Sequence, residues 1–140
     1  MFLGTFEHTL DEKQRLTMPA KLRSKIDTTI YISGGIEPCL QVRSEDVFKQ
    51  LLEELNSKSD MNSKRRLIKR HILGNTCEIK LDGSGRVSIP TNILDLAKIK
   101  KNVYIIGQGD YIEIWDAEVY KQYINENANN LIDFANSFGD

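Results

Sequence analysis

The sequence predicts an α+β fold, a mainly β core with flanking helices, built from two copies of one unit. A ten-residue motif at residues 10–19 recurs at residues 81–90, an offset of 71. Both copies follow the pattern Leu-Asp-x-x-x-Arg-apolar-Ser/Thr-apolar-Pro. A pattern of this length held twice in register is not expected by chance, so we interpret the chain as a duplication. Short β-rich runs follow each motif, which indicates strands at the centre of the fold.

The repeat extends beyond the motif, and its offset drifts by one or two residues between elements. Such drift is typical of insertions in surface loops. The matching segments are 30–34 with 103–107, 40–42 with 112–114, and 47–52 with 119–124. Neither copy has enough core to fold alone, because below roughly 70–80 residues a single hydrophobic core supplies little net stability. We therefore expect one compact unit in which the two copies pair about a pseudo-two-fold axis with interleaved strands.

The first copy predicts two hairpins separated by a short helix and closed by a longer one. In order, these are a strand over residues 2–10, a strand over 16–18 that completes a motif hairpin, a helix from Pro19 to about residue 25, a second hairpin over 30–42, and a helix that Ser44 caps. Pro19 suits the first position of a helix, where its missing N–H costs nothing. Ser44 suits the N-cap because its hydroxyl can accept a backbone N–H bond.

The second copy predicts the same order of elements, with Pro90 opening its short helix and Asp116 capping its last one. Between the copies, a polar loop over residues 56–63 precedes a basic amphipathic helix over 64–73 that ends at Gly74. The predicted organisation is a first repeat (1–55), a linker with the basic helix (56–75), a second repeat (76–124), and an acidic C-terminal helix or tail (125–140) that frays at its end.

The formal net charge of −1 conceals an asymmetry. Residues 1–101 carry 18 basic and 13 acidic side chains, whereas residues 102–140 carry one and seven. This asymmetry allows a basic face, although charges that only solvate the surface explain it equally well. The apolar runs are too short to span a membrane, and we see no signal peptide, so we expect a cytoplasmic protein. We interpret Cys39 and Cys77 as inert thiols rather than a disulfide.

The repeated Asp-x-x-x-Arg is the pattern that carries chemistry. An Asp at a turn can accept backbone N–H bonds, or it can orient the Arg guanidinium through a bidentate contact. Either role presents a charged planar fork that suits phosphates and guanine edges. Five basic residues fall within residues 13–25, a stretch without one acid that overlaps the first motif, namely Lys13, Arg15, Lys21, Arg23 and Lys25. The alternative is a salt bridge that only closes each turn, and the sequence leaves both interpretations open.

The remaining polar clusters point less clearly to a function. The basic segment at residues 64–71 fits a nucleic-acid arm, a subunit interface or a solvated helix face. His8 and His71 are not duplicated, and the sequence has no Cys-x-x-Cys pair, His cluster or complete phosphate-binding loop. An Arg four residues beyond each motif Asp favours an ionised structural role over acid–base catalysis. We therefore expect neither an enzyme nor a metal or other cofactor.

The chain resembles the MraZ family, two-copy bacterial members of the AbrB-like (SpoVT/AbrB) transcription regulators. The resemblance covers nearly the whole chain. The residues that carry it are Asp11-x-x-x-Arg15-Leu-Thr-Met-Pro19, Leu81-Asp82-Gly-Ser-Gly-Arg86-Val-Ser-Ile-Pro90, and Ile112-Glu-Ile-Trp115 after the turn at residues 107–109.

The resemblance implies a duplicated swapped-hairpin β-barrel and sequence-specific binding of double-stranded DNA. The expected targets are promoter-proximal direct repeats upstream of the division and cell-wall gene cluster. It also implies a homo-oligomer, a ring of several subunits, in the cytoplasm and associated with the nucleoid. Carried over by position, the DNA-binding residues are Arg15 and Arg86, with Lys13 as a phosphate contact, Lys21 and Arg23 nearby, and Asp11 and Asp82 in support.

Two departures from the family pattern predict unequal halves. Gln14 stands where the family usually has Gly, which would alter the first loop, and Leu94 stands where the first copy has Arg23. The alternative function is an oligomeric interaction scaffold that ignores nucleic acid, for which Arg15→Ala would have no effect on partner binding. A nucleotide-hydrolysing enzyme would instead lose turnover in a folded Asp82→Asn variant.

Overall fold

The computed structural model describes residues 1–58 and 61–139 as a mixed α+β structure with a largely antiparallel sheet. The first copy contributes β1 (Thr5–Thr9), β2 (Arg15–Thr17), α1 (Ala20–Arg23), β3 (Thr29–Gly34), β4 (Leu40–Ser44) and α2 (Glu45–Asn56). After α3 (Ser63–Gly74), the second contributes β5 (Thr76–Lys80), β6 (Arg86–Ser88), α4 (Thr91–Leu96), β7 (Asn102–Gly107), β8 (Ile112–Asp116) and α5 (Ala117–Ser137). The predicted α+β class is confirmed.

The strands form a six-stranded sheet in the order β1-β7-β8-β4-β3-β5 and a separate ribbon of β2 and β6. The second hairpins predicted in each copy, β3–β4 and β7–β8, are confirmed. Every other pair joins the two copies: β1 with β7, β3 with β5, β4 with β8, and β2 with β6. Each of these pairs joins a strand of the first copy to a strand of the second. The two copies therefore share one sheet.

Two expectations about the strands are wrong. The predicted motif hairpin does not form, because β1 pairs with β7 and β2 pairs with β6. The described chain also contains no closed β-barrel, since the sheet ends at β1 on one side and at β5 on the other. The physical reason is the same in both cases. Each edge strand runs into a motif loop that turns the chain away from the sheet and into the ribbon.

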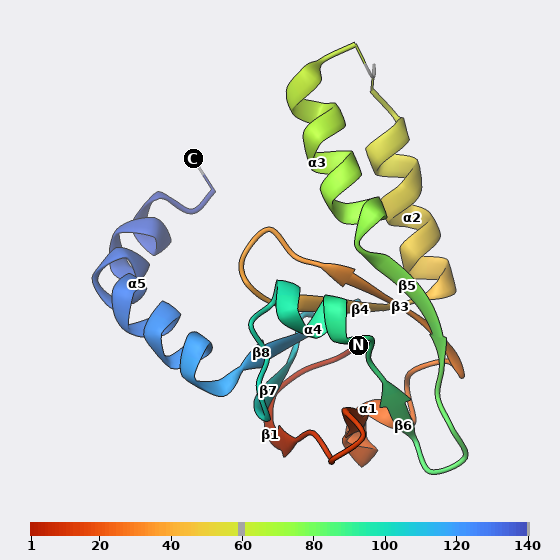
Figure 1. Ribbon diagram of the computed structural model, residues 1–140. Coiled ribbons are helices and arrows are strands. Elements are labelled where there is room, and N and C mark those ends of the chain that lie inside the picture. The colour runs from red at the N-terminus through yellow and green to blue at the C-terminus, as the bar shows by residue number, and fades with distance from the viewer. Residues whose placement is uncertain (59–60, 140) are drawn as a thin grey trace.

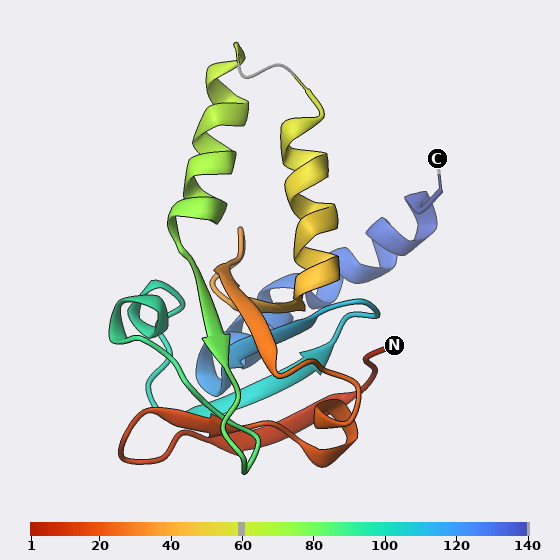
Figure 2. The ribbon, with the colours of Figure 1, turned by 90° about the vertical axis from the view of Figure 1, so that its right-hand side faces the viewer.

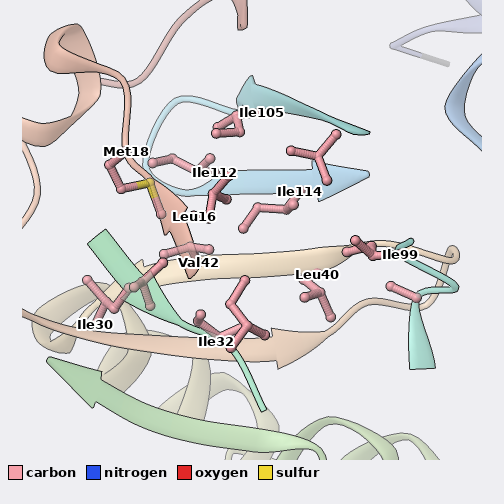
Figure 3. Packing of buried hydrophobic residues seen from close by; sticks show 14 of the residues in the cluster. Leu16, Met18, Ile30, Ile32, Leu40, Val42, Ile99, Ile105, Ile112 and Ile114 are labelled. Atoms are coloured by element: carbon pink, nitrogen blue, oxygen red, sulfur yellow. The ribbon is translucent and has the colours of Figure 1, made fainter. Parts of the chain in front are cut away.

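The β2–β6 ribbon, rather than closure of a barrel, completes the hydrophobic core. Leu16 of β2 and Val87 of β6 lie opposite each other and are fully buried. Figure 3 shows Leu16 and Met18 among side chains of the surrounding sheet, including Ile105 and Ile112. Because the inward residues of the ribbon belong to the main core cluster, its outward residues are held on a rigid support.

The helices lie around this core. Figures 1 and 2 show α2 and α3 side by side, projecting as a helical hairpin from the end of the molecule opposite α1. The longer helix α5 runs off a different side. Its first turns pack on an aromatic cluster in which Tyr104 meets Tyr120 with 5.4 Å between ring centroids. Tyr31 and Phe48 stack at 4.6 Å in the corresponding place of the first copy, so the duplication extends to this contact.

The predicted helix starts are mostly confirmed. The Ser44 hydroxyl accepts the Val47 N–H at 3.4 Å, and the Asp116 carboxylate accepts the Glu118 N–H at 3.2 Å. Pro19 and Pro90 are N-caps rather than first helical residues, one position earlier than predicted. The C-terminal segment is helical to Ser137, as predicted for its first part, and residue 140 lies outside the described residues.

The predicted polar loop at residues 56–63 is bounded by the end of α2 at Asn56 and the start of α3 at Ser63. Its residues 59–60 lie outside the described residues. Of the helices described, none combines the length and the apolar character that crossing a bilayer requires.

Candidate nucleic-acid interface

The first motif loop is built around the carboxylate of Asp11. Its Oδ1 accepts the backbone N–H groups of Lys13 at 2.8 Å and Arg15 at 2.9 Å. Its Oδ2 accepts the Nε–H of Arg15 at 2.7 Å. The two roles that the sequence left open, holding the loop and orienting the guanidinium, therefore occur together.

The second motif loop repeats this geometry. Asp82 Oδ1 accepts the N–H groups of Ser84 at 2.8 Å and Arg86 at 2.9 Å, and Oδ2 accepts the Arg86 Nε–H at 2.8 Å. The carboxylate orients the guanidinium, as one of the two open interpretations allowed, but through a single hydrogen bond rather than a bidentate contact, because backbone N–H groups occupy Oδ1. In both loops the guanidinium donates to the carboxylate through Nε, at Oδ2.

Hydrogen bonds within the loops lower the pKa of both motif aspartates. The Arg15 backbone N–H, followed by its side chain, lowers the pKa of Asp11 below its ordinary value. The Arg86 backbone N–H is likewise the largest cause of the lowered pKa of Asp82. Both groups are solvent-exposed, so this lowering reflects hydrogen bonding in the loop rather than a buried ion pair.

Gln14 does not distort the first loop, contrary to expectation. It adopts a left-handed conformation with φ of 59°, and Gly85 does the same at the equivalent position with φ of 75°. The N–H of each residue donates to the backbone oxygen of its motif Asp at 3.0 Å. The aspartate hydrogen bonds set the loop shape, and Gln accepts the left-handed conformation at some cost in conformational energy.

The β2–β6 ribbon brings the two arginines onto one face. Arg15 lies opposite Ser88, and Arg86 lies opposite Thr17, across antiparallel strands. Since side chains alternate along a strand, these four point outward while Leu16 and Val87 point inward. Diagonal neighbours in such a pair lie roughly 7–8 Å apart. The two arginines are thus diagonal neighbours on the outer face of the ribbon.

The arginine side chains are half-buried but reach solvent, with exposed fractions of 27% for Arg15 and 36% for Arg86. Within residues 1–58 and 61–139, no protein group hydrogen-bonds to the Nη atoms of either side chain. The salt bridge therefore closes each turn and still leaves donors for an external acceptor. A planar fork with two Nη groups matches a phosphate or the acceptor edge of a guanine.

The other predicted residues lie beside these loops. Lys13 is exposed within the first loop, and Lys21 is exposed on α1. The side chain of Arg23 is already engaged, since its Nη1 donates to the carbonyl oxygen of Ser84 at 2.7 Å. The basic helix α3 does not join this group, because it projects from the opposite end of the molecule (Figures 1 and 2). In the described part of the chain, no cluster of His, Cys, Asp or Glu could hold a metal ion.

A family model described as "MraZ protein, putative antitoxin-like" matches the chain twice, over residues 1–71 and 72–137. The chain belongs to the MraZ family. Three relatives each carry the name transcriptional regulator MraZ. The Mesoplasma florum protein is 44% identical over 136 residues, which cover 96% of this chain and 93% of the relative. The Mycoplasma capricolum subsp. capricolum protein is 45% identical over 90% of this chain and 96% of its own length. The Mycoplasmoides gallisepticum protein is 35% identical over 100% and 99%.

Sequence reasoning missed the neighbours that hold each MraZ-type motif loop. The Gln14 amide oxygen accepts the Thr91 hydroxyl at 2.8 Å, so the first loop is tied to α4 of the other copy. The second loop is tied to α1 through Arg23 and Ser84. Aligning the two copies would have singled out these positions, because Thr91 matches Ala20 and Gln14 matches Gly85 at the motif offset.

Proposed function

We propose that this chain is a sequence-specific transcriptional regulator that binds double-stranded DNA through the outer face of the β2–β6 ribbon. The observation that carries the proposal is the repeated loop geometry, in which the register of β2 and β6 places Arg15 and Arg86 on one face and each arginine donates to its motif aspartate through Nε. The names of the MraZ relatives agree with this role.

A two-stranded ribbon fits within the major groove of B-DNA. The two arginines would supply base readout or paired phosphate contacts, and Lys13 and Lys21 would add phosphate contacts at the margin. Thr17 and Ser88, which lie opposite the arginines, place hydroxyl groups on the same face. Asp11 and Asp82 take part by fixing the arginines, which reduces the conformational entropy lost on binding.

The expected target is a set of direct repeats upstream of the division and cell-wall gene cluster. We propose that copies of this chain assemble into a ring, so that neighbouring subunits engage neighbouring repeats and gain affinity through effective concentration. Support for assembly comes from the distal half of α5 and its C-cap, which expose large apolar side chains: Leu131, Ile132 and Phe134 on the helix and Phe138 at its C-cap. Monomers seldom leave such a group uncovered. We place the assembly in the cytoplasm, on the nucleoid, without catalytic activity.

The cross-copy pairing of strands also supports the swapped-hairpin interpretation of the family fold. Strand β1 of the first copy pairs with β7 of the second, and β5 of the second pairs with β3 of the first. In this interpretation the two halves of one chain take the places of two smaller protomers, and the ribbon lies on their pseudo-two-fold axis.

The proposal is tested by DNA binding across a salt series, using a labelled duplex from upstream of the gene that encodes the chain. We expect Arg15→Ala and Arg86→Ala each to weaken binding by roughly 5- to 150-fold, as for loss of a bidentate base contact of about 1–3 kcal/mol. Lys49→Ala, which removes one positive charge from α2, is the matched control and should bind as wild type does. The proposal would be contradicted if both arginine variants folded and bound the duplex as tightly as wild type does. If wild type bound no duplex at low salt, the result would favour the oligomeric interaction scaffold.

A further inference from the structure

The two motif loops have the same internal hydrogen bonds but are held by different neighbours. In the second loop, the guanidinium of Arg23 reaches across from α1 and donates from Nη1 to the Ser84 carbonyl. That carbonyl belongs to the peptide unit that joins Ser84 to Gly85, directly before Arg86. Arg23 therefore restrains the segment that aims Arg86.

The glycine in the second loop makes room for this arginine. A Cβ atom built on Gly85 would overlap the Cδ of Arg23, and it would lie only 2.5 Å from Nη1. The arginine stem thus lies directly over the Gly85 backbone. Gly85 is buried although the residues around it are exposed or half-buried, which agrees with a side chain from elsewhere covering it.

The first loop has no equivalent of the contact between Arg23 and the second loop. Leu94 occupies the position equivalent to Arg23, and its apolar side chain is buried in the core. Gln14 occupies the position equivalent to Gly85, and its own side chain makes the cross-copy contact to Thr91. Two chemically different contacts therefore perform the same task, each tying a motif loop to the short helix of the other copy.

We infer that Arg23 is a positioning residue for Arg86 rather than a DNA contact, and that it acts by holding the second loop against α1. The inference rests on the proposed function, because it assigns Arg23 a part in DNA binding through Arg86. It also makes the second loop dependent on the first copy, so the two halves do not present their arginines independently.

A double-mutant cycle separates the two roles for Arg23. We expect Arg23→Leu to weaken binding of the labelled upstream duplex by roughly tenfold in the wild-type and Arg15→Ala backgrounds, which corresponds to about 1.4 kcal/mol. In the Arg86→Ala background the same substitution should cost less than about twofold, because no positioned arginine remains to be lost. An equal loss in all three backgrounds would assign Arg23 to the DNA and overturn the inference.

A second test introduces the equivalent of the Gln14–Thr91 contact at the second loop. The variant Ala20→Thr/Arg23→Leu/Gly85→Gln places a Gln in the second loop and a Thr at the start of α1, the equivalents of Gln14 and Thr91, and removes the charge at position 23. If Arg23 acts by positioning, this variant should recover binding to within about threefold of wild type, with an unchanged salt slope. If Arg23 contacts a phosphate, the variant should stay as weak as Arg23→Leu.

Amide spectra without DNA distinguish failure of this inference from failure of the proposed function. In Arg23→Leu, the ¹⁵N–¹H resonances of Gly85 and Arg86 should shift, whereas those of Gln14 and Arg15 should not. Unchanged Gly85 and Arg86 resonances would overturn the inference whether or not the protein binds DNA. If these resonances shift in Arg23→Leu but the wild-type protein binds no duplex, the proposed function is rejected, while the contact between Arg23 and the second loop stands.

Discussion

The two motif loops reach the same geometry from different sequences. The first has Gln14 at the left-handed position and the second has Gly85, yet the aspartate hydrogen bonds agree within 0.1 Å in every pair. The carboxylate therefore dictates the loop shape, and the left-handed residue determines only which neighbour holds the loop. In the proposed function the aspartate and the arginine play the same part in both loops, whereas the residues that make the contact to the other copy differ between the loops.

The largest effect on stability is expected from the buried residues of the β2–β6 ribbon, which both loops join. Leu16 and Val87 meet at the centre of the ribbon with 0% exposure. Leu16→Ala should lower the free energy of unfolding by about 2–5 kcal/mol, since the removed side chain leaves a cavity beneath both loops. Val87→Ala should cost about 2 kcal/mol, because fewer carbon atoms are lost. Urea denaturation measures both, and a change below about 0.5 kcal/mol in either would show that the ribbon does not complete the core.

An intermediate effect is expected from exchanging the left-handed residues. Gly85→Gln should lower the free energy of unfolding by about 1–2 kcal/mol or more, because the new side chain is strained at positive φ and overlaps Arg23. Gln14→Gly should change stability by less than about 1 kcal/mol, since relief of strain offsets the lost bond to Thr91. Thermal or urea unfolding of the two variants provides the comparison. An equal loss of unfolding free energy in the two variants would mean that the same kind of contact holds both loops.

The smallest effect concerns pH. Hydrogen bonding lowers the pKa of Asp11 and Asp82 below the ordinary value of 3.8, the Arg15 and Arg86 backbone N–H groups being the largest causes. A carboxylate with a lowered folded-state pKa stabilises the fold above its unfolded-state pKa, and this contribution is lost as the pH falls through the lowered value. The wild-type melting temperature should therefore fall more steeply below about pH 4 than that of Asp11→Asn/Asp82→Asn. Parallel curves from circular dichroism would contradict this.

The sequence predicted those features that depend on local chemistry. The caps at Ser44 and Asp116 and the two β-rich hairpins follow from residue types and spacing within a few positions. The repeated motif also pointed correctly to contacts between Asp11 and Arg15 and between Asp82 and Arg86, because four residues separate each pair across a turn.

The features that were not predicted depend on pairing between distant segments. The three-residue strand β2 can satisfy its backbone equally well beside β1 or beside β6, and nothing in its own residues specifies the partner. The contact between Arg23 and Ser84 spans 61 residues and exists only once α1 lies against the second loop. Gln14 was expected to alter its loop because the family usually has Gly there, and the aspartate hydrogen bonds that hold the loop are not visible in a comparison of residue types.

We propose that DNA binds the face of the β2–β6 ribbon that carries both loops. The most direct test is titration of ¹⁵N-labelled protein with a duplex from upstream of the encoding gene, following backbone amide resonances. We expect the largest shifts to fall on residues 11–17 and 82–88 together, while residues 64–71 of α3 change little. Shifts concentrated on α3, or on one loop without the other, would contradict it.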